Sequence, residues 1–289
     1  MQDNHIPQAI ECRGVAKIWD TDGEPFVALQ DINFDVKAGE FVVLLGPSGC
    51  GKSTLLYLLA GLEGTSRGEV LSEGVPITGT SPQRGMIFQE AALFPWLNIR
   101  DRAPLPGKSC REAALFPWLN IRDNVAFGLA LQGMPKGQRE QRALELLQRV
   151  GLNGFAHKRP SELSGGMRQR AAMARALALE PKVLMMDEPF AALDIQTRAK
   201  MQNYLLDLWR QSRASMLLVT HSIEEAIGLA DRIVVFTARP GRIKTIVPVT
   251  LERPRNPRDP AFHALHDQLA ELLADEVDRA FAEQEALGA

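Results

Sequence analysis

The sequence has few cysteines, little net charge, no long apolar run and no N-terminal targeting pattern. Its three cysteines lack metal-type spacing, which favours a reducing compartment. A formal net charge of −2 argues against a basic nucleic-acid-binding surface, so we expect no nucleic-acid partner. No apolar stretch approaches the about 20 residues of a membrane helix, and the first residues do not resemble a secretory signal. We therefore expect a cytoplasmic chain that meets a membrane only through a partner.

The rest of the composition is that of an ordinary globular protein. Of the 289 residues, 45% are apolar and 24% are charged, which suffices for one large domain or two small ones. No repeat has the period that builds solenoids. Fold and function therefore have to be inferred from local motifs.

The stretch FVVLLGPSGCGKSTLLYLLAGL carries the strongest local signal. Residues Phe41–Leu45 are branched and apolar, which predicts a buried parallel strand. Gly46, Gly49 and Gly51 follow and allow the backbone to curl, and Ser53–Leu62 predicts an apolar helix. This order of strand, loop and helix is the context that the phosphate-binding pattern G-x-x-x-x-G-K-S requires.

In that pattern, loop N–H groups surround phosphate oxygens, and the N-terminus of the helix favours negative charge. Lys52 would then reach the outer phosphates, and the Ser53 hydroxyl would be a Mg²⁺ ligand. The alternative is a glycine-rich turn beside a solvated lysine, which the flanking strand and helix disfavour. We expect a nucleotide site here.

A second motif, KVLMMDEPFAALD, places two carboxylates at the end of a predicted strand. Residues Val183–Met186 are apolar and are followed by Asp187 and Glu188. Ligands of open α/β sheets bind at the carboxyl ends of the strands. Asp187 is therefore a candidate Mg²⁺ ligand, and Glu188 is a candidate to orient the attacking water or accept its proton. The alternative is an acidic turn with solvated charges.

A third predicted strand, Met216–Thr220, ends at His221. A single histidine after a strand more often only begins a helix. Here, however, three predicted strands deliver polar groups to one sheet edge. We expect His221 to contact the γ-phosphate of a nucleotide.

The stretch LSGGMRQRAAMARALALEPKVLMMDEP carries a family resemblance. It is similar to the ATP-binding subunit of ATP-binding cassette (ABC) transporters, and the likeness runs from about residue 10 to 250. Leu163-Ser164-Gly165-Gly166 resembles the signature motif of that family, and Ser164 is expected to cap the helix that follows. Met167 departs from the most general pattern, which has Gln there.

The resemblance implies a role for each motif. Trp19 would stack on adenine; the alternative is that it is an ordinary surface aromatic residue. Gln89 would be the Q-loop residue, and Asp194 would belong to the D-loop. The signature would contact the nucleotide of a second subunit, which implies a head-to-tail dimer around two ATP molecules. The implied nucleotide-binding residues are Trp19, Gly46, Pro47, Ser48, Gly49, Cys50, Gly51, Lys52, Ser53, Thr54, Gln89 and Asp187. The implied catalytic residues are Lys52, Glu188 and His221, and the implied metal ligands are Ser53, Gln89 and Asp187.

The expected fold class is α/β, a P-loop NTPase core with a parallel sheet, an antiparallel β flap and an inserted helical subdomain. We expect residues 1–289 to form a single ABC ATPase domain, with a core over 8–89 and 162–250, a helical insert over 90–161 and a tail over 251–289. The stretch FVALQDINFDVKAGE predicts the flap, and IVVFTARPGRIKTIVPV predicts a hairpin about its Pro-Gly turn. The tail predicts an amphipathic helix over Pro260–Glu285, with an apolar stripe of Phe262, Leu265, Leu269, Leu272, Val277 and Phe281.

Three further stretches, LFPWLNIRDNVAFGL, LSGGMRQR and LERPRNP, resemble the branch of importers for nitrate, aliphatic sulfonates and taurine. This implies an ATP-hydrolysing subunit that uses ATP and Mg²⁺ and binds a transmembrane permease at the cytoplasmic face of the inner membrane. A periplasmic or lipoprotein solute-binding subunit would be an indirect partner. Two alternatives stay open, a soluble non-transport ABC ATPase and a cassette that binds ATP but is uncoupled.

The segment EAALFPWLNIRD occurs twice, at residues 90–101 and 112–123. Gln89 precedes only the first copy, and NVAFGLALQG follows only the second, so deleting either 90–111 or 102–123 gives the same sequence. This is typical of a tandem duplication or of an error in the gene record. A repeat fold would need about three units.

In the family, the segment after Gln89 lines a groove for a short helix of the membrane subunit. Aromatic residues are enriched in interface cores, so Leu93, Phe94 and Trp96 are candidates for that surface. The alternative is that they pack inside the helical insert.

Overall fold

The computed structural model describes residues 8–21, 24–88, 115–191, 193–212 and 214–287. The chain divides into two compact units, Met1–Thr80 together with Ser215–Ala289, and Ser81–Ala214. The predicted partition into a core over 8–89 and 162–250 and an insert over 90–161 stays a prediction. In the described ranges, no helix is both long and apolar enough to cross a membrane.

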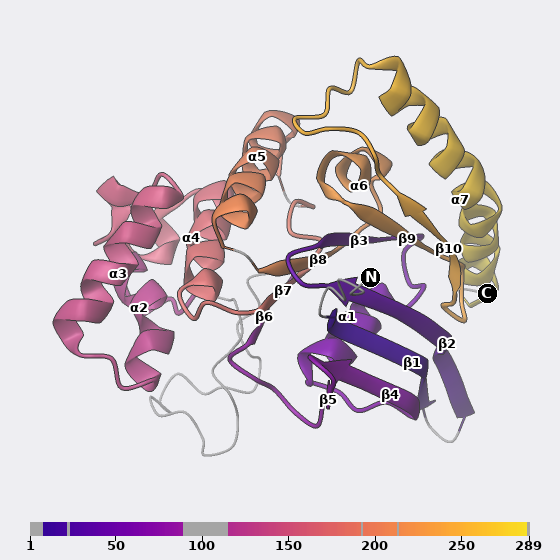
Figure 1. Cartoon of the computed structure of the whole chain (residues 1–289), viewed down its shortest axis with the longest axis horizontal. Helices are drawn as coiled ribbons and strands as arrows, with labels where there is room; N and C mark the ends of the chain where they lie inside the picture. Colours follow the sequence, from indigo (N-terminus) through magenta and orange to yellow (C-terminus); the bar gives the residue numbers. More distant parts are fainter. Residues whose placement is uncertain (1–7, 22–23, 89–114, 192, 213, 288–289) are drawn as a thin grey trace, which may run out of the picture. The chain divides into compact units, whose positions relative to one another are not determined.

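The first unit contains an antiparallel sheet, which confirms the predicted flap (Figure 1). Its strands are β1 (Gln8–Thr21), β2 (Glu24–Lys37), β4 (Arg67–Ser72) and β5 (Val75–Pro76), in the order β2-β1-β4-β5. Alternate residues of β2, namely Ile32, Phe34 and Val36, are buried. This period of two explains why the segment forms a strand with one face in the core.

The other sheet of this unit carries the loop of interest. It contains β3 (Phe41–Leu45), β8 (Ser215–Thr220), β9 (Arg232–Phe236) and β10 (Ile243–Pro248), in the order β10-β9-β3-β8. Strand β3 runs parallel to β8 and β9, whereas β9 and β10 form the predicted antiparallel hairpin. Every residue of β3 is buried, as its continuous apolar sequence predicted. The helices of the unit are α1 (Lys52–Ala60), α6 (Ile223–Leu229) and α7 (Pro260–Leu287).

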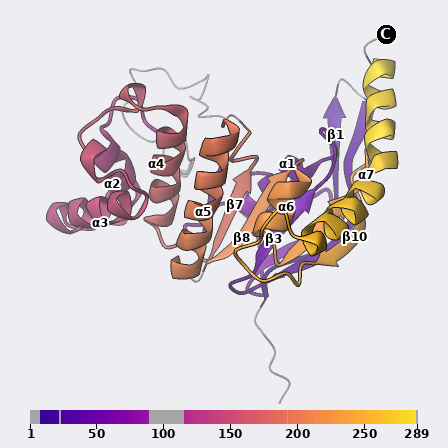
Figure 2. The same ribbon diagram turned by 90° about the horizontal axis from the view of Figure 1, so that it is seen from above.

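Helix α7 lies beside β10 in both views (Figures 1 and 2). Phe262 is buried, but Val277 and Phe281 are 45% and 65% exposed, so the predicted single apolar stripe is wrong at this end. Glu276 is buried instead. Its carboxylate accepts a hydrogen bond from Lys244 of β10 at 2.8 Å, and this ionic partner explains why an acid faces inward.

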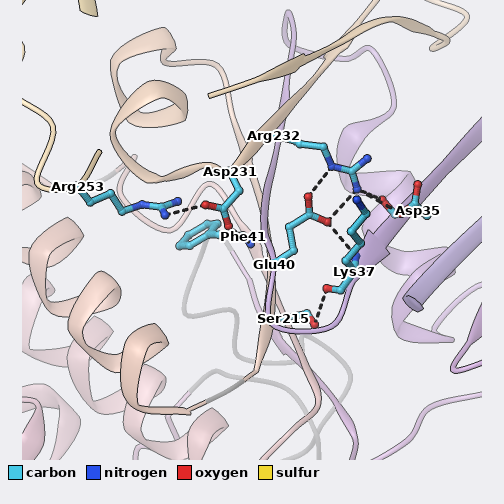
Figure 3. A network of polar contacts seen from close by, with 8 residues as sticks. All are labelled: Asp35, Lys37, Glu40, Phe41, Ser215, Asp231, Arg232 and Arg253. Atoms are coloured by element: carbon cyan, nitrogen blue, oxygen red, sulfur yellow. Dashed lines mark hydrogen bonds and ion pairs between the residues drawn. The ribbon is translucent and has the colours of Figure 1, made fainter. Parts of the chain in front are cut away.

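Polar side chains join the amino ends of the parallel strands (Figure 3). Asp231 accepts hydrogen bonds from the Phe41 amide at 2.9 Å and from Arg253 at 2.7 Å. The neighbouring Arg232 donates to a Glu40 oxygen at 2.8 Å. Ser215 donates to the Lys37 carbonyl at 3.1 Å. The start of each parallel strand is therefore fixed by at least one side-chain contact.

The second unit pairs β6 (Arg84–Ile87) in parallel with β7 (Val183–Asp187). Its helices are α2 (Ile121–Leu131), α3 (Lys136–Arg149), α4 (Gly165–Leu177) and α5 (Ile195–Ser212), with 3₁₀ turns at Asn153–Phe155 and Pro160–Glu162. Helices α2, α3 and α4 pack together (Figure 2). Helix α3 is mostly polar and buries Ala143, Leu146 and Leu147, so tertiary packing supplies much of its stability.

Candidate functional site

The glycine-rich loop connects β3 to α1, as predicted. Gly49 and Gly51 have φ angles of 77° and 96°, which L side chains rarely adopt. A Cβ on Gly51 would also lie 2.8 Å from the Ala28 carbonyl oxygen and 2.7 Å from Leu29. Glycine is therefore required at position 51 for both backbone angle and space.

The ammonium group of Lys52 is enclosed by this loop. The residue is 4% exposed, and its Nζ donates to the carbonyl oxygens of Gly46 at 2.8 Å and Pro47 at 2.6 Å. Burial raises the pKa of the neighbouring Cys50 thiol, although Lys52 acts in the opposite direction. The neutral Cys50 thiol does not neutralise the Lys52 ammonium, which is a positive charge buried inside the loop. This arrangement suits an anion such as a phosphate group.

His221 lies at the same sheet edge as this loop. In the parallel pairing of β3 with β8, Leu45 is opposite Thr220, so Gly46 and His221 follow directly from paired residues. The His221 side chain is exposed. The structure thus brings together two predicted features that lie far apart in the sequence.

The turn that carries His221 is held by residues that sequence reasoning missed. The Thr220 hydroxyl donates to the buried Glu225 carboxylate at 2.7 Å, and the Ser222 amide donates to the Thr220 hydroxyl at 3.0 Å. The Ser222 hydroxyl caps α6 by accepting from the Glu225 amide at 3.3 Å. The spacing Ser-x-x-Glu is a signature of a helix start and was the available signal.

Trp19 lies on β1, where it pairs with Phe26 of β2. The Lys17 ammonium sits 4.0 Å from the centroid of the indole ring and also donates to the Gly64 carbonyl at 2.9 Å. A cation therefore covers one face of Trp19. Adenine stacking would have to use the other face, and this role stays a prediction.

The two carboxylates lie at the carboxyl end of β7 in the second unit, as predicted. Asp187 is 4% exposed and ends the strand. Met186 pairs with Ile87 of β6, so Phe88 follows at the same edge, while Gln89 lies outside the described residues. Hydroxyl and carboxylate oxygens such as those of Ser53 and Asp187 are the donors that Mg²⁺ prefers.

Glu188 has a φ of 43°, in the left-handed region. For a residue with a side chain, this conformation costs about 1–3 kcal/mol and is found mainly where the surroundings impose it, often at functional sites. No local sequence pattern predicts this backbone conformation. Asp31, Glu73 and Glu180 also have positive φ, so the conformation alone does not assign a function to Glu188.

The signature motif begins α4, and Ser164 is its N-cap as predicted. The Ser164 hydroxyl accepts from the Met167 amide at 3.4 Å, and both Ser164 and Gly165 are exposed. Gly166 is buried, and a Cβ there would lie 2.9 Å from a Thr197 methyl group. Leu163 is also buried. The motif therefore exposes the polar start of α4, while Leu163 and Gly166 beside it are buried.

Asp194 precedes α5. Its carboxylate accepts a hydrogen bond from the Thr197 amide at 3.0 Å, and hydrogen bonds from the Thr197 hydroxyl and amide lower the pKa of Asp194. These contacts are typical of a residue that starts a helix. They neither support nor oppose the D-loop role, which stays a prediction.

The first copy of the duplicated segment lies outside the described residues, as do Leu93, Phe94 and Trp96. The second copy is described from Leu115 onward. Leu115 is buried, whereas Trp118 is 53% exposed and stacks on Phe116 with ring centroids 5.2 Å apart. In the second copy, one apolar residue packs inside and another faces outward. The assignment of Leu93, Phe94 and Trp96 to a permease groove or to the interior of the insert stays a prediction.

A buried asparagine fixes this second copy. Asn124, which is fully buried, accepts from the Phe116 amide at 2.6 Å and donates to the carbonyl oxygens of Phe116, Leu119 and Asn120. The first copy is followed by Arg102 in place of this asparagine. Sequence comparison of the copies could have identified Asn124 as the first difference after them.

Comparisons with known proteins agree with this picture. Residues 29–191 match the family model described as ABC transporter. The nitrate import ATP-binding protein NrtD of Synechocystis is 43% identical over 256 residues, which cover 86% of this chain and 88% of that protein. The aliphatic sulfonates import ATP-binding protein SsuB of Bacillus licheniformis is 41% identical over 260 residues, which cover 90% of this chain and 91% of that protein.

Among solved structures, the dimeric post-hydrolysis state of the ATP-binding cassette MJ0796, bound to ADP and Pi, is similar with a TM-score of 0.68. It is 29% identical and covers 84% of this chain and all of that one. The likeness confirms the predicted α/β cassette fold. Motifs, fold and relatives together show that the chain belongs to the ABC transporter family, as an ATP-hydrolysing subunit of the importer branch.

Proposed function

We propose that this ATPase powers the import of nitrate, an aliphatic sulfonate or taurine through a transmembrane permease. The observation that supports the site most strongly is the buried Lys52 ammonium in the glycine loop, at the same sheet edge as His221. The solute class rests on relatives named for nitrate and sulfonate import.

In the proposed mechanism, the loop from Gly46 to Gly51 binds the phosphates of ATP through backbone N–H groups. Lys52 exchanges its two carbonyl acceptors for phosphate oxygens, because a charged acceptor makes the stronger hydrogen bond. Ser48 and Gly49 are exposed, so phosphates can approach this side of the loop. Trp19 stacks on the adenine through its remaining face.

Ser53 and Asp187, together with Gln89, would hold Mg²⁺. The metal would neutralise charge that develops on the phosphates during transfer. Glu188 orients the attacking water and accepts its proton, and its imposed backbone conformation aims the carboxylate. The exposed His221, which directly follows β8, contacts the γ-phosphate.

The working unit is proposed to be a head-to-tail dimer. The exposed Ser164 and Gly165 at the start of α4 form a helix N-terminus that suits an anion, and here the anion is the nucleotide held by the other subunit. The similar cassette described above is itself dimeric. The D-loop residue Asp194 is assigned to the same subunit interface.

The permease is proposed to bind near the second copy of the duplicated segment. Phe116 and the exposed Trp118 form an aromatic surface of the kind enriched in protein interfaces. The subunit would then be peripheral at the cytoplasmic face of the inner membrane. The solute-binding subunit would act through the permease and would not contact this chain.

ATP hydrolysis by the purified protein, compared with Glu188→Gln, tests the site assignment. We expect the substitution to reduce turnover by at least about 100-fold while ATP still binds. Turnover that survives the substitution would remove Glu188 as the residue that activates water. The solute class is tested by measuring transport of nitrate, taurine and an alkanesulfonate into vesicles that contain the whole transporter. If none of the three solutes were transported, the import proposal would be wrong.

A further inference from the structure

The hairpin turn between β9 and β10 touches the phosphate-binding loop, and the functional assignments above give it no role. The turn comprises Ala238–Arg242. Arg239 donates to the Gly49 carbonyl oxygen at 3.5 Å, and its guanidinium lies 4.4 Å from the centroid of the Phe26 ring. The aromatic ring thus supports the guanidinium on one side while the loop carbonyl faces it on another.

A second contact involves backbone only. A Cβ placed on Gly241 would lie 2.0 Å from the Cys50 carbonyl oxygen, so the two segments approach as closely as glycine allows. The Gly241 amide donates to the Ala28 carbonyl at 3.0 Å, and the Gly241 carbonyl accepts from the Gln30 amide at 2.9 Å. Strand β2 therefore holds Gly241 in place against the loop.

The turn is also fixed from within and from behind. The Thr237 hydroxyl donates to the Ala238 carbonyl at 2.9 Å and accepts from the Arg242 amide at 3.0 Å. The Ala238 amide donates to Glu276 of α7 at 2.9 Å. A turn held at this many points can act as a rigid support for the loop it touches.

The two contacts have a direct consequence for the loop's hydrogen-bond donors. In a trans peptide, the carbonyl oxygen and the next N–H point in opposite directions. Arg239 holds the Gly49 oxygen, which directs the Cys50 N–H away from the turn. Gly241 faces the Cys50 oxygen, which likewise directs the Gly51 N–H away from the turn.

We propose that the Arg239–Gly241 turn positions the Cys50 and Gly51 N–H groups for phosphate binding, with Arg239 as the positioning residue. The inference rests on the proposed function, in which these N–H groups contact the phosphates of ATP. Arg239 itself need not touch the nucleotide. Its effect should therefore appear with any ligand that carries the same phosphates.

Arg242 offers a matched control on the same turn, because its guanidinium donates to the Gln30 side chain at 2.6 Å on β2. The experiment measures binding of Mg-ATP and of Mg-pyrophosphate by calorimetry to the wild-type protein, Arg239→Ala, Arg239→Lys and Arg242→Ala. Losing this exposed hydrogen bond should weaken both ligands roughly fivefold in Arg239→Ala, the effect expected of one ordinary hydrogen bond. Arg239→Lys should recover part of the loss, Arg242→Ala should stay within twofold, and kcat at saturating ATP should change little.

Three results would overturn the inference. Equal weakening in Arg242→Ala would indicate a general loss of turn stability, and weakening of ATP without pyrophosphate would indicate a contact with the nucleoside. Lys52→Ala separates this inference from the proposed function, since unchanged phosphate binding in that variant would overturn the site itself. Loss of binding in Lys52→Ala with normal binding in Arg239→Ala would overturn only the role of the turn.

Discussion

The two ends of the parallel strands in the first unit are built differently. At the amino ends, Asp231 accepts a hydrogen bond from the Phe41 amide, and Arg232 donates to Glu40 (Figure 3). At the carboxyl ends, a glycine loop folds around Lys52, and His221 is exposed. Charged side chains therefore stabilise one end, while backbone groups and one buried cation shape the other.

This difference distinguishes charged side chains that stabilise the fold from a charged side chain that is available to a ligand. Arg232 bonds to carboxylates, which raise the pKa of its guanidinium even though burial lowers it. Lys52 instead bonds to neutral carbonyl oxygens, which an anionic ligand can replace. Within the described residues, the carbonyl acceptors of the Lys52 ammonium are neutral, and a cation held in this way inside a glycine loop is the feature that points to phosphate.

Two glycines that flank β3 provide the largest expected contrast. Gly51 and Gly39 both have positive φ, at 96° and 74°, but a Cβ would clash at Gly51 and meets nothing within 4 Å at Gly39. Gly51→Ala should abolish ATP binding, whereas Gly39→Ala should cost about 1 kcal/mol of stability with ATP affinity unchanged. Calorimetric titration with ATP and urea unfolding check both variants. Equal effects on affinity would mean that the two ends do not differ as described.

A smaller effect is expected from the acid that supports the hairpin turn. Burial raises the pKa of Glu276, but the hydrogen bonds from Lys244 and the Ala238 amide outweigh it, so the pKa lies below its usual value. A carboxyl group with a depressed folded-state pKa stabilises the fold above its unfolded pKa of about 4.3, and this is lost as pH falls through the folded value.

The free energy of unfolding should therefore fall more steeply below about pH 4.3 in the wild type than in Glu276→Gln. Urea unfolding at several pH values measures this slope. Glu271→Gln is the matched control, because Glu271 is exposed on the same helix. If Glu271→Gln flattened the slope as much as Glu276→Gln, the assignment to the turn would be wrong.

The smallest effect is expected from removing the duplicated unit. Deleting residues 102–123 joins the first copy to Asn124, so the buried asparagine keeps identical residues around it. We expect basal ATPase activity and melting temperature within experimental error of the full chain. A clear fall in stability and in permease-stimulated ATPase activity would show that the duplication is functional.

Much of the fold followed from local sequence patterns. The strand Phe41–Leu45 was predicted with its observed bounds. A short continuous apolar run between a turn and a glycine-rich loop is typical of a buried strand. The antiparallel flap and the β9–β10 hairpin were predicted by alternation and by the Pro-Gly turn. The exposure of Val277 and Phe281 was not predicted, because burial at the end of a helix depends on which other elements pack against it.

The candidate site divides along similar lines. Motif residues such as Lys52, Asp187 and Ser164 lie where their motifs predicted, since each motif includes the turn that positions it. The strain at Glu188, the support of His221 by Thr220 and the contact of Arg239 with Gly49 were not predicted. The strain and the Arg239 contact depend on backbone angles or on residues distant in sequence, which no local pattern encodes, whereas the Ser222-x-x-Glu225 spacing was an available local signal for the turn before α6.

The most direct test of the difference between the two ends is one paired measurement on Lys52→Ala and Asp231→Asn. ATP affinity and the free energy of unfolding are measured for both variants. We predict that Lys52→Ala loses ATP binding and keeps its stability, whereas Asp231→Asn binds ATP normally and loses about 2 kcal/mol of stability, as expected for a charged hydrogen-bond acceptor. Normal ATP binding by Lys52→Ala, or loss of ATP binding by a folded Asp231→Asn, would contradict the account.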